Sequence, residues 1–387
     1  MRGHPEGRPP RGSPVVLQVL PALETGGVER GTVEITQAIV RAGGTALVAS
    51  QGGRLVGGVE RAGGRHIRLR LNSKDPWVIW RNAAALAEII RRERVEIVHA
   101  RSRAPAWSAL LASRRTGAHF VTTYHALYGE DLPLKRRYNA VMARGERVIA
   151  ISHYVAEQLL ARHRIDPGRV RVIPRGVDPA AFDPDAIEPN RIARIMDTWR
   201  LPEGARTVVL AARLTPWKGQ SVLIDAIARL RRPDLCAVLI GSDRGHPRYA
   251  VALVRQAERL GVIGQLRLVG ECDDMPAALL LGDVAVSAST RPEGFGRAVI
   301  EAQAMRRPVI ATDHGGAVET VEHGVTGWRV PPGDAEALAA AIAHAFALPE
   351  AERAQVGARA RASVQRSYTT SAMQKATLEV YAELLGR

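Results

Sequence analysis

Short β-rich runs alternate with helical stretches along most of the chain, and this alternation occurs twice. In the first half the strand candidates are residues 15–20, 45–50, 66–71, 95–100, 119–125, 147–152 and 170–174. After a break, further candidates are residues 207–214, 236–242, 265–270, 284–289 and 308–313. Strands separated by helix-length segments are typical of parallel sheets with crossover helices. The sequence therefore predicts an α/β protein with two doubly wound domains, whose ligands bind beyond the carboxyl ends of the strands.

The break between the two sets of strands predicts where the domains divide. Residues 178–206 contain four prolines and no strand candidate, so we interpret them as an interdomain connection with one short helix. We expect a first domain at residues 15–177, a second at 207–367 and a C-terminal helix at 368–387. Residues 1–14 are rich in Pro, Gly and Arg and lack the apolar core of a signal peptide, which predicts a disordered leader.

The positive charge of the chain is confined to its first half. The net charge is +15; residues 1–177 contain 29 basic and 14 acidic residues, whereas the remainder contains 25 of each. Such an excess favours an anionic partner, either a membrane surface, a charged lipid acceptor or nucleic acid. Aromatic residues make up only 4% of the chain and no nucleic-acid-binding motif is present, so nucleic acid is the weakest of the three.

Two segments, residues 101–115 and 132–144, combine arginines with apolar side chains at helical spacing. Helices of this kind suit a lipid headgroup interface, but an amphipathic helix packed on its own sheet would give the same pattern. No apolar run approaches the roughly 20 residues needed to span a bilayer. The two cysteines show neither a disulfide framework nor metal-ligand spacing. We expect a soluble or surface-bound cytoplasmic protein.

The richest candidate site follows the strand candidate at residues 284–289. A loop containing Glu293, Gly294, Phe295 and Gly296 leads into an amphipathic helix that carries Glu301. Backbone N–H groups at such a helix start can bind phosphate, while carboxylates beside it suit the hydroxyls of a sugar or ribose. This stretch predicts a ligand that is both phosphorylated and rich in hydroxyls.

Three further candidates also follow predicted strands. Gly26 and Gly27 come after the first strand, at the start of a helix, where glycines let a backbone approach a phosphate. Arg213 and Lys218 lie five residues apart across a strand-to-helix turn, and two fixed cations suit a diphosphate that gains charge as it leaves. His125 ends a strand at the mouth of the first sheet. Taken singly, a tight turn, solvated surface charges and a structural histidine are the competing interpretations.

Glu293 and Glu301 could be mistaken for the two carboxylates of a glycoside hydrolase. Such a pair must face one bond about 5–10 Å apart, whereas this turn and helix would direct the two groups to different parts of an extended ligand. A hydrolase also has no need of Arg213 and Lys218. Transfer from a sugar nucleotide accounts for all four residues.

These motifs together resemble the family 4 retaining glycosyltransferases of GT-B fold, which include lipopolysaccharide-core and phosphatidylinositol sugar transferases. The resemblance covers residues 15–387, and its motifs are E-x7-E at Glu293 and Glu301, R-x4-K-G at 213–219, V-I-P-x-G-V-D at 172–178, and Gly-Gly at 26–27. It implies two Rossmann-like domains facing a central cleft, with the C-terminal helix crossing back to the N-terminal domain.

The resemblance also implies roles for individual residues. Arg213 and Lys218 would neutralise the donor diphosphate as it leaves, and Glu301 would hold the ribose hydroxyls. Glu293 and the backbone of Phe295 and Gly296 would contact the donor sugar and the diphosphate.

From the first domain, His125 would meet the transferred sugar, and Gly26 and Gly27 would approach a phosphate or the acceptor. The implied reaction retains the anomeric configuration, uses a nucleotide-diphosphate sugar as donor and needs no metal or other cofactor. The implied acceptor is lipid-linked or of the lipopolysaccharide type, in bacterial cell-envelope synthesis at the inner face of the plasma membrane.

The chain departs from the family pattern at three places, and the last two leave the donor sugar and base open. Many relatives have Asn where this chain has Arg175, the loop at residues 240–245 lacks the usual glycine-rich form, and Arg291 precedes the E-x7-E motif. Two other functions also remain open: a non-catalytic subunit that binds sugar nucleotides at a membrane, and a soluble transferase or phosphorylase acting on small sugars.

Overall fold

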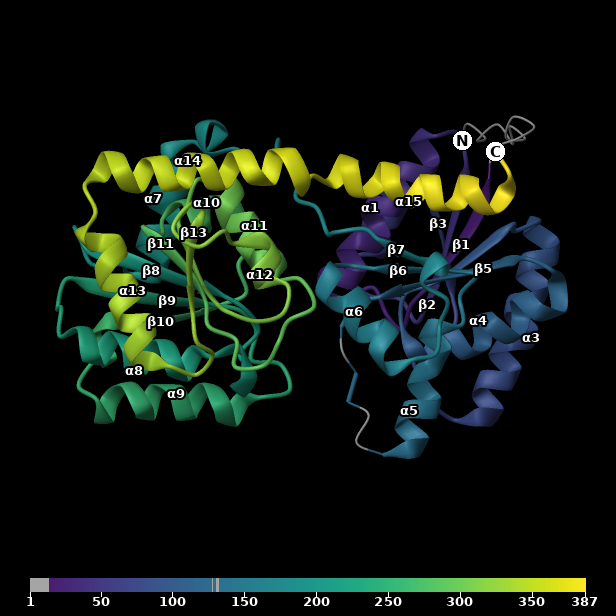
Figure 1. Cartoon of the computed structure of the whole chain (residues 1–387), viewed down its shortest axis with the longest axis horizontal. Coiled ribbons are helices and arrows are strands. Elements are labelled where there is room, and N and C mark those ends of the chain that lie inside the picture. Colours follow the sequence, from purple (N-terminus) through teal and green to yellow (C-terminus); the bar gives the residue numbers. More distant parts are fainter. Residues whose placement is uncertain (1–13, 127, 130–131) are drawn as a thin grey trace, which may run out of the picture. The chain divides into compact units, whose positions relative to one another are not determined.

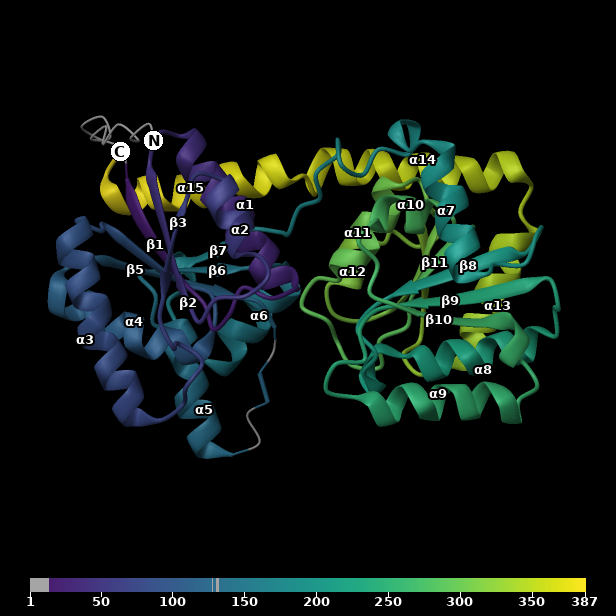
Figure 2. The same cartoon turned by 180° about the vertical axis from the view of Figure 1, so that it is seen from behind.

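The computed structural model describes residues 14–126, 128–129 and 132–387, so nearly all of the predicted leader lies outside the described residues. The chain divides into two compact units (Figures 1 and 2). Unit 1 comprises the chain up to Arg175 together with Ser371–Arg387, and unit 2 is Gly176–Thr370. Each unit is built on its own parallel sheet, which confirms the predicted α/β class with two doubly wound sheets.

Within the described residues, unit 1 has a seven-stranded sheet in the order β3-β2-β1-β4-β5-β6-β7. Its strands are β1 Val15–Val19, β2 Thr45–Ser50, β3 Arg65–Arg68, β4 Ile97–Ala100, β5 His119–Tyr124, β6 Arg147–Ala150 and β7 Val170–Val172. β1 pairs with both β2 and β4, so the strand order reverses at this point of the sheet. In open α/β sheets such a reversal opens a crevice at the carboxyl ends of the strands, where ligands bind.

Helices cover the sheet of unit 1, and one of them comes from the far end of the chain. They are α1 Gly27–Arg41, α2 Val56–Arg61, α3 Pro76–Glu93, α4 Arg103–Thr116, α5 Pro133–Asn139, α6 His153–Arg162 and α15 Thr370–Leu385, with the 3-10 turns η1 Ala140–Ala143 and η2 Pro167–Arg169. Met373 and Tyr381 of α15 pack with Val16 and Ile35 in one core. The C-terminal helix therefore returns to the first unit, as predicted (Figure 1).

Unit 2 has a six-stranded sheet in the order β10-β9-β8-β11-β12-β13. Its strands are β8 Arg206–Ala211, β9 Leu235–Ile240, β10 Leu266–Gly270, β11 Val284–Ser287, β12 Val309–Thr312 and β13 Gly327–Val330. The sequence predicts all of these strands except β13. That strand has four residues, begins with a glycine and pairs only with β12, so it carries little of the apolar pattern of the others.

The helices of unit 2 surround a single large apolar core. They are α7 Pro189–Trp199, α8 Gln220–Leu230, α9 Pro247–Arg259, α10 Met275–Leu280, α11 Arg297–Ala304, α12 Ala317–Thr320, α13 Ala335–Ala347 and α14 Glu350–Ser367, with η3 Pro184–Ala186, η4 Pro216–Lys218 and η5 Ile263–Gln265. Residues 178–206 pack onto this unit, because Arg191 of α7 makes two hydrogen bonds of 2.8 and 2.7 Å to Asp274, the N-cap of α10.

Candidate functional site

The loop after β11 holds Glu293 between a cation and a hydroxyl. Lys218 Nζ lies 2.6 Å from Glu293 Oε2, and the two side chains are only 15% and 19% exposed. Ser289 Oγ donates a hydrogen bond to the other carboxylate oxygen. Lys218 and Glu293 follow β8 and β11, which are neighbours in the sheet. The structure thus brings together two of the residues that the sequence singles out separately.

Lys218 reaches this position because a glycine follows it. Gly219 has φ +76°, in the left-handed region that favours glycine, and a Cβ there would overlap the carbonyl oxygen of Ala288. The turn can therefore pass directly beneath the end of β11. The ammonium of Lys218 also lies 4.5 Å from the ring centroid of Trp217, a cation–π contact.

Arg213 lies at the carboxyl end of β8 and is exposed. Its backbone carbonyl accepts a 2.9 Å hydrogen bond from Nε2 of Gln220, a fully buried side chain at the start of α8. Among the described residues, no ion pair involves the Arg213 guanidinium, unlike Lys218. Its charge is consequently available to an anionic ligand.

Glu301 is a buried residue of α11, and its carboxylate pairs with an arginine of the same helix. Arg297 Nε lies 3.0 Å from Glu301 Oε1, an i,i+4 ion pair. The helix begins after Gly296, which has φ +82°, and the preceding Phe295 is buried with its ring 5.6 Å from that of Tyr368. These contacts fix the entry into α11, so the backbone N–H groups of its first turn have a defined direction.

The loop after β12 supports the Glu293 loop through backbone contacts. Gly316 N donates to the Glu293 carbonyl at 2.9 Å, and Cβ atoms on Gly315 and Gly316 would collide with the backbone of residues 292–295. Both glycines follow the strand that the sequence predicts. Their role here is close packing of two loops.

Sequence reasoning missed three polar residues that hold this arrangement. Thr312 Oγ1 donates to the Ser289 carbonyl at 2.9 Å, and His314 Nε2 lies 2.8 Å from the same oxygen. Because the partner is a carbonyl, Nε2 of His314 must carry the proton. The usable signal is position, since Thr312 is the last residue of β12 and Ser289 and His314 follow β11 and β12.

The remaining predicted residues lie in unit 1. Gly26 and Gly27 form the N-terminal end of α1, and the Gly27 carbonyl accepts a 2.6 Å hydrogen bond from Arg175. A Cβ on Gly27 would meet nothing within 4 Å, so sterics within the protein do not demand a glycine there. His125 follows β5, and its Nε2 is buried without a hydrogen-bond partner in the described structure. Burial, and then the nearby Arg175 and Arg101, hold the pKa of His125 well below its usual range.

The two basic segments of unit 1 differ in what their apolar side chains do. In α4, Leu110 is buried and Trp107 Nε1 donates to the Tyr138 carbonyl at 3.0 Å, so this segment packs inside the unit. At the start of α5, by contrast, Leu132 and Leu134 are 56% and 80% exposed. Within the described residues, no helix is long and apolar enough to cross a membrane.

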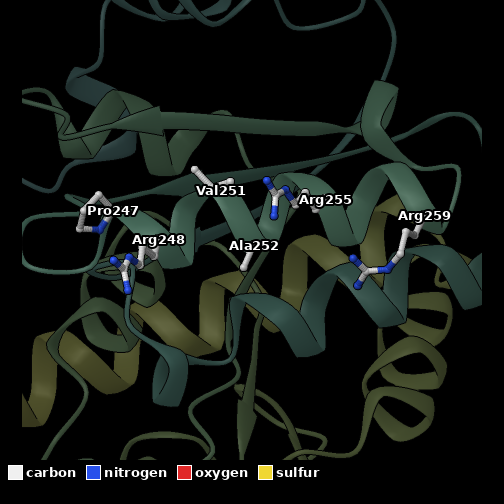
Figure 3. A pocket seen from close by; sticks show the side chains of 6 residues that line it. All are labelled: Pro247, Arg248, Val251, Ala252, Arg255 and Arg259. Carbon is white, nitrogen blue, oxygen red and sulfur yellow. The ribbon is translucent and has the colours of Figure 1, made fainter.

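A separate concavity of about 610 Å³ lies along α9 (Figure 3). Its lining comes from one helix and consists of Pro247, Arg248, Val251, Ala252, Arg255 and Arg259. None of these side chains belongs to the network around Glu293. In the part of the chain that the structure describes, no group of His, Cys, Asp or Glu is arranged to hold a metal ion.

Two doubly wound units, with carboxylates and cations at the strand ends of the second, are the architecture expected of glycosyltransferases of the GT-B type. The chain belongs to the group 1, family 4 type of these proteins: the family described as Glycosyltransferase Family 4 matches residues 25–181, and Glycosyl transferases group 1 matches residues 192–363. The predicted GT-B fold is thereby confirmed.

Individual relatives agree with this assignment. A glycosyltransferase from Rickettsia africae is 37% identical, with a TM-score of 0.90 over 97% of this chain and 99% of that chain. A D-inositol 3-phosphate glycosyltransferase from Salinispora tropica is 31% identical over 70% of this chain and 61% of its own length. The match to several such curated relatives spans only about half of their length, from 46% upward. Anabaena HepE, solved with UDP-glucose, shares the fold at 23% identity and a TM-score of 0.84, over 95% of this chain and 99% of that chain.

Proposed function

We propose that this protein transfers a sugar from a nucleotide-diphosphate donor to an acceptor hydroxyl, with retention of the anomeric configuration. The observation that carries the proposal is the Lys218–Glu293 pair, at the carboxyl ends of adjacent strands. A cation and a carboxylate in contact match the two kinds of group on a nucleotide sugar, its diphosphate and its hydroxyls. In the complex, Lys218 would contact the diphosphate and Glu293 the hydroxyls, instead of each other.

In the proposed reaction the bond between the anomeric carbon and the diphosphate oxygen breaks, and a bond to the acceptor oxygen forms on the same face. The acceptor proton passes to the departing diphosphate. Lys218 exchanges Glu293 for a phosphate oxygen, and Arg213 adds a second positive charge, so both stabilise the charge that develops on the leaving group. We assign no metal or other cofactor, because these two cations supply the required charge.

The donor hydroxyls are the proposed partners of the two carboxylates. Once Lys218 turns to the phosphate, Glu293 accepts hydrogen bonds from the sugar, while Glu301 accepts them from the ribose. The backbone N–H groups of Phe295 and Gly296, just before α11, face the diphosphate. The HepE complex with UDP-glucose supports a nucleotide sugar as the donor class.

We propose that the acceptor is anionic, either lipid-linked or of the lipopolysaccharide type, and is met at a membrane surface. A cavity of about 410 Å³ in unit 1 has a basic lining that includes Arg136, Arg137, Arg144, Arg162 and Arg164. No carboxylate belongs to its described lining, and the exposed Leu132 and Leu134 flank Pro133, which is one of the lining residues. Arginines suit phosphates and exposed leucines suit acyl chains. Relatives named for an inositol phosphate acceptor support a phosphorylated substrate class.

The test is release of nucleotide diphosphate from a panel of UDP-, GDP- and ADP-sugars, with inositol phosphates and membrane extracts as acceptors. We expect turnover with one donor and a loss of at least about 100-fold in Glu293→Ala, by the measure of one lost preorganised contact. Glu258→Ala, which removes an exposed carboxylate of α9, is the matched control. The proposal would be rejected if no combination gave release, or if Glu293→Ala left the release unchanged.

The two alternative functions predict different experimental results. A non-catalytic subunit would show donor binding in calorimetry without any turnover. An enzyme for small sugars would turn over without floating on anionic vesicles at low salt.

A further inference from the structure

Two buried side-chain nitrogens of unit 1 have no hydrogen-bond partner in the described structure. Arg101 directly follows β4 and is 2% exposed, and His125 directly follows β5. Arg101 Nη2 and His125 Nε2 are both buried without a hydrogen-bond partner in the described structure. Buried polar atoms are rarely left unpaired, because each forfeits its hydration. An acceptor that belongs to a ligand would satisfy Arg101 Nη2, and it would satisfy His125 Nε2 in the tautomer that protonates this nitrogen.

A second guanidinium, that of Arg175, lies near His125 and comes from the end of the edge strand β7. Arg175 follows β7, is buried, and donates to the Gly27 carbonyl at 2.6 Å, at the start of α1. It crosses α1 at Gly31, where any Cβ would overlap its Nη2 atom. A glycine inside a helix costs about 1 kcal/mol relative to alanine. The cost is understandable if the position of the guanidinium matters.

The groups around these cations do not supply the missing acceptor. Arg101 Nε is bonded to Gln18 Oε1 at 2.7 Å, and Glu34 is the carboxylate that faces Arg101. His99 is closed off by hydrogen bonds of 2.7 Å to Tyr381 and 2.6 Å to Thr123. The uncharged His125 adds no compensating negative charge.

The cluster lies at the topological switch point of the sheet. Arg101 and Gly26 follow β4 and β1, the neighbouring strands at which the order reverses. The N-terminus of α1 adds backbone N–H groups and the positive end of the helix dipole. Position, charge and unsatisfied donors all favour an anion.

We propose that Arg101, Arg175, His125 and the first turn of α1 form a subsite for an anionic group of a substrate, a phosphate or a carboxylate. This rests on the proposed function, and it adds an anion contact in unit 1 to Arg213 and Lys218 of unit 2. The group belongs to the acceptor or to the donor, and both sources present the same oxygens to the two guanidinium groups.

Calorimetry on the full-length protein tests the subsite without turnover, with D-inositol 3-phosphate, myo-inositol and UDP as titrants. We expect the phosphate to improve binding over myo-inositol. Arg175→Asn and Gly31→Ala should each weaken that advantage about tenfold or more, the scale of a lost charge-assisted hydrogen bond. Gly31→Ala displaces the guanidinium while keeping the arginine. Arg91→Asn, at an exposed arginine of α3, is the control, and thermal melts verify folding.

The outcomes separate this inference from the proposed function. Weaker inositol phosphate binding with unchanged UDP binding assigns the group to the acceptor, and the reverse assigns it to the donor. Unchanged affinity for both ligands in Arg175→Asn and in Gly31→Ala overturns the subsite, even if the wild type transfers sugar. A crystal structure with the phosphate elsewhere and a water joining Arg101 to His125 overturns it as well. Failure of the wild type to bind any nucleotide or to turn over rejects the proposed function instead.

Discussion

Glu293 and Lys218 neutralise each other across 2.6 Å, and this pairing sets a condition on any phosphate that binds at Lys218. The phosphate must displace the carboxylate, which then needs new donors. A nucleotide sugar brings both the phosphate and the hydroxyls, whereas a nucleotide alone brings only the phosphate at this point. The pair should therefore distinguish UDP from a UDP-sugar.

Glu293→Gln tests this exchange. Without the carboxylate, Lys218 has no competing anion, so we expect UDP to bind as tightly as in the wild type or a few-fold more tightly. Transfer should nevertheless fall by at least about 100-fold, because the sugar hydroxyls lose a charged acceptor. Calorimetry with UDP and a kinetic assay measure the two effects. Weaker UDP binding in the variant would contradict the exchange.

The buried histidines of unit 1 predict how stability depends on pH. Burial lowers the pKa of His99 and of His125 well below the ordinary value of 6.5. Below pH 6.5 the unfolded chain takes up protons that the folded chain does not, so unfolding becomes easier as the pH falls. Above that pH both states are neutral and the contribution is complete.

We expect the melting temperature to be level between about pH 7 and 8 and to fall progressively below about pH 6.5. His125→Asn should reduce the steepness of that fall, since one of the histidines with a strongly lowered pKa is gone. His246→Asn, at an exposed histidine, should leave it unchanged. An identical pH profile for His125→Asn and the wild type would show that this histidine does not contribute.

Several site residues could not be read from the sequence because their partners are distant along the chain. Arg175 appears in the sequence only as a departure from the family pattern, and its contact with Gly27 spans 148 positions. Ser289 and His314 are ordinary residue types whose role comes from two loops meeting. In contrast, Lys218 and Glu293 each belong to a motif with its own chemistry, so both could be predicted.

At the scale of elements, turns rather than helices decide where the charged groups point. The strands could be predicted because parallel strands are buried on both faces and are therefore apolar throughout. β13 was not predicted because it is a short edge strand. The close packing of the turns after β8, β11 and β12 could not be predicted, since it depends on backbone atoms that carry no sequence signal.

Gly219→Ala tests the turn after β8. The alanine would need φ +76° and would strike the Ala288 carbonyl, so we expect a loss of stability of about 2 kcal/mol or more together with a misplaced Lys218. Gly264→Ala, where a Cβ meets nothing within 4 Å, is the control. Chemical denaturation measures the difference, and equal stabilities would show that the turn can relax.

Across the whole molecule, the basic excess of the first 177 residues gathers partly around α5, beside two exposed leucines. Basic side chains near an anionic bilayer contribute roughly 1 kcal/mol each, and salt screens them. Apolar side chains add a contribution that salt does not remove. The two together would give vesicle binding that salt weakens only in part.

We expect the protein to float with anionic vesicles at low salt and to float less at high salt. The double variant Leu134→Ser, Arg137→Glu should lose most of this binding. Arg255→Glu, which changes the arginine-lined face of α9, should not (Figure 3). Equal loss in both variants would indicate a general effect of net charge.

Gly31 and Arg175 also constrain the history of the chain. A Cβ at position 31 and the guanidinium of Arg175 as it lies here exclude each other, so with alanine at 31 that guanidinium would have to lie elsewhere. We therefore expect glycine at 31 wherever an arginine at 175 reaches the start of α1. An alignment of relatives should contain glycine at 31 without arginine at 175, but almost never the reverse.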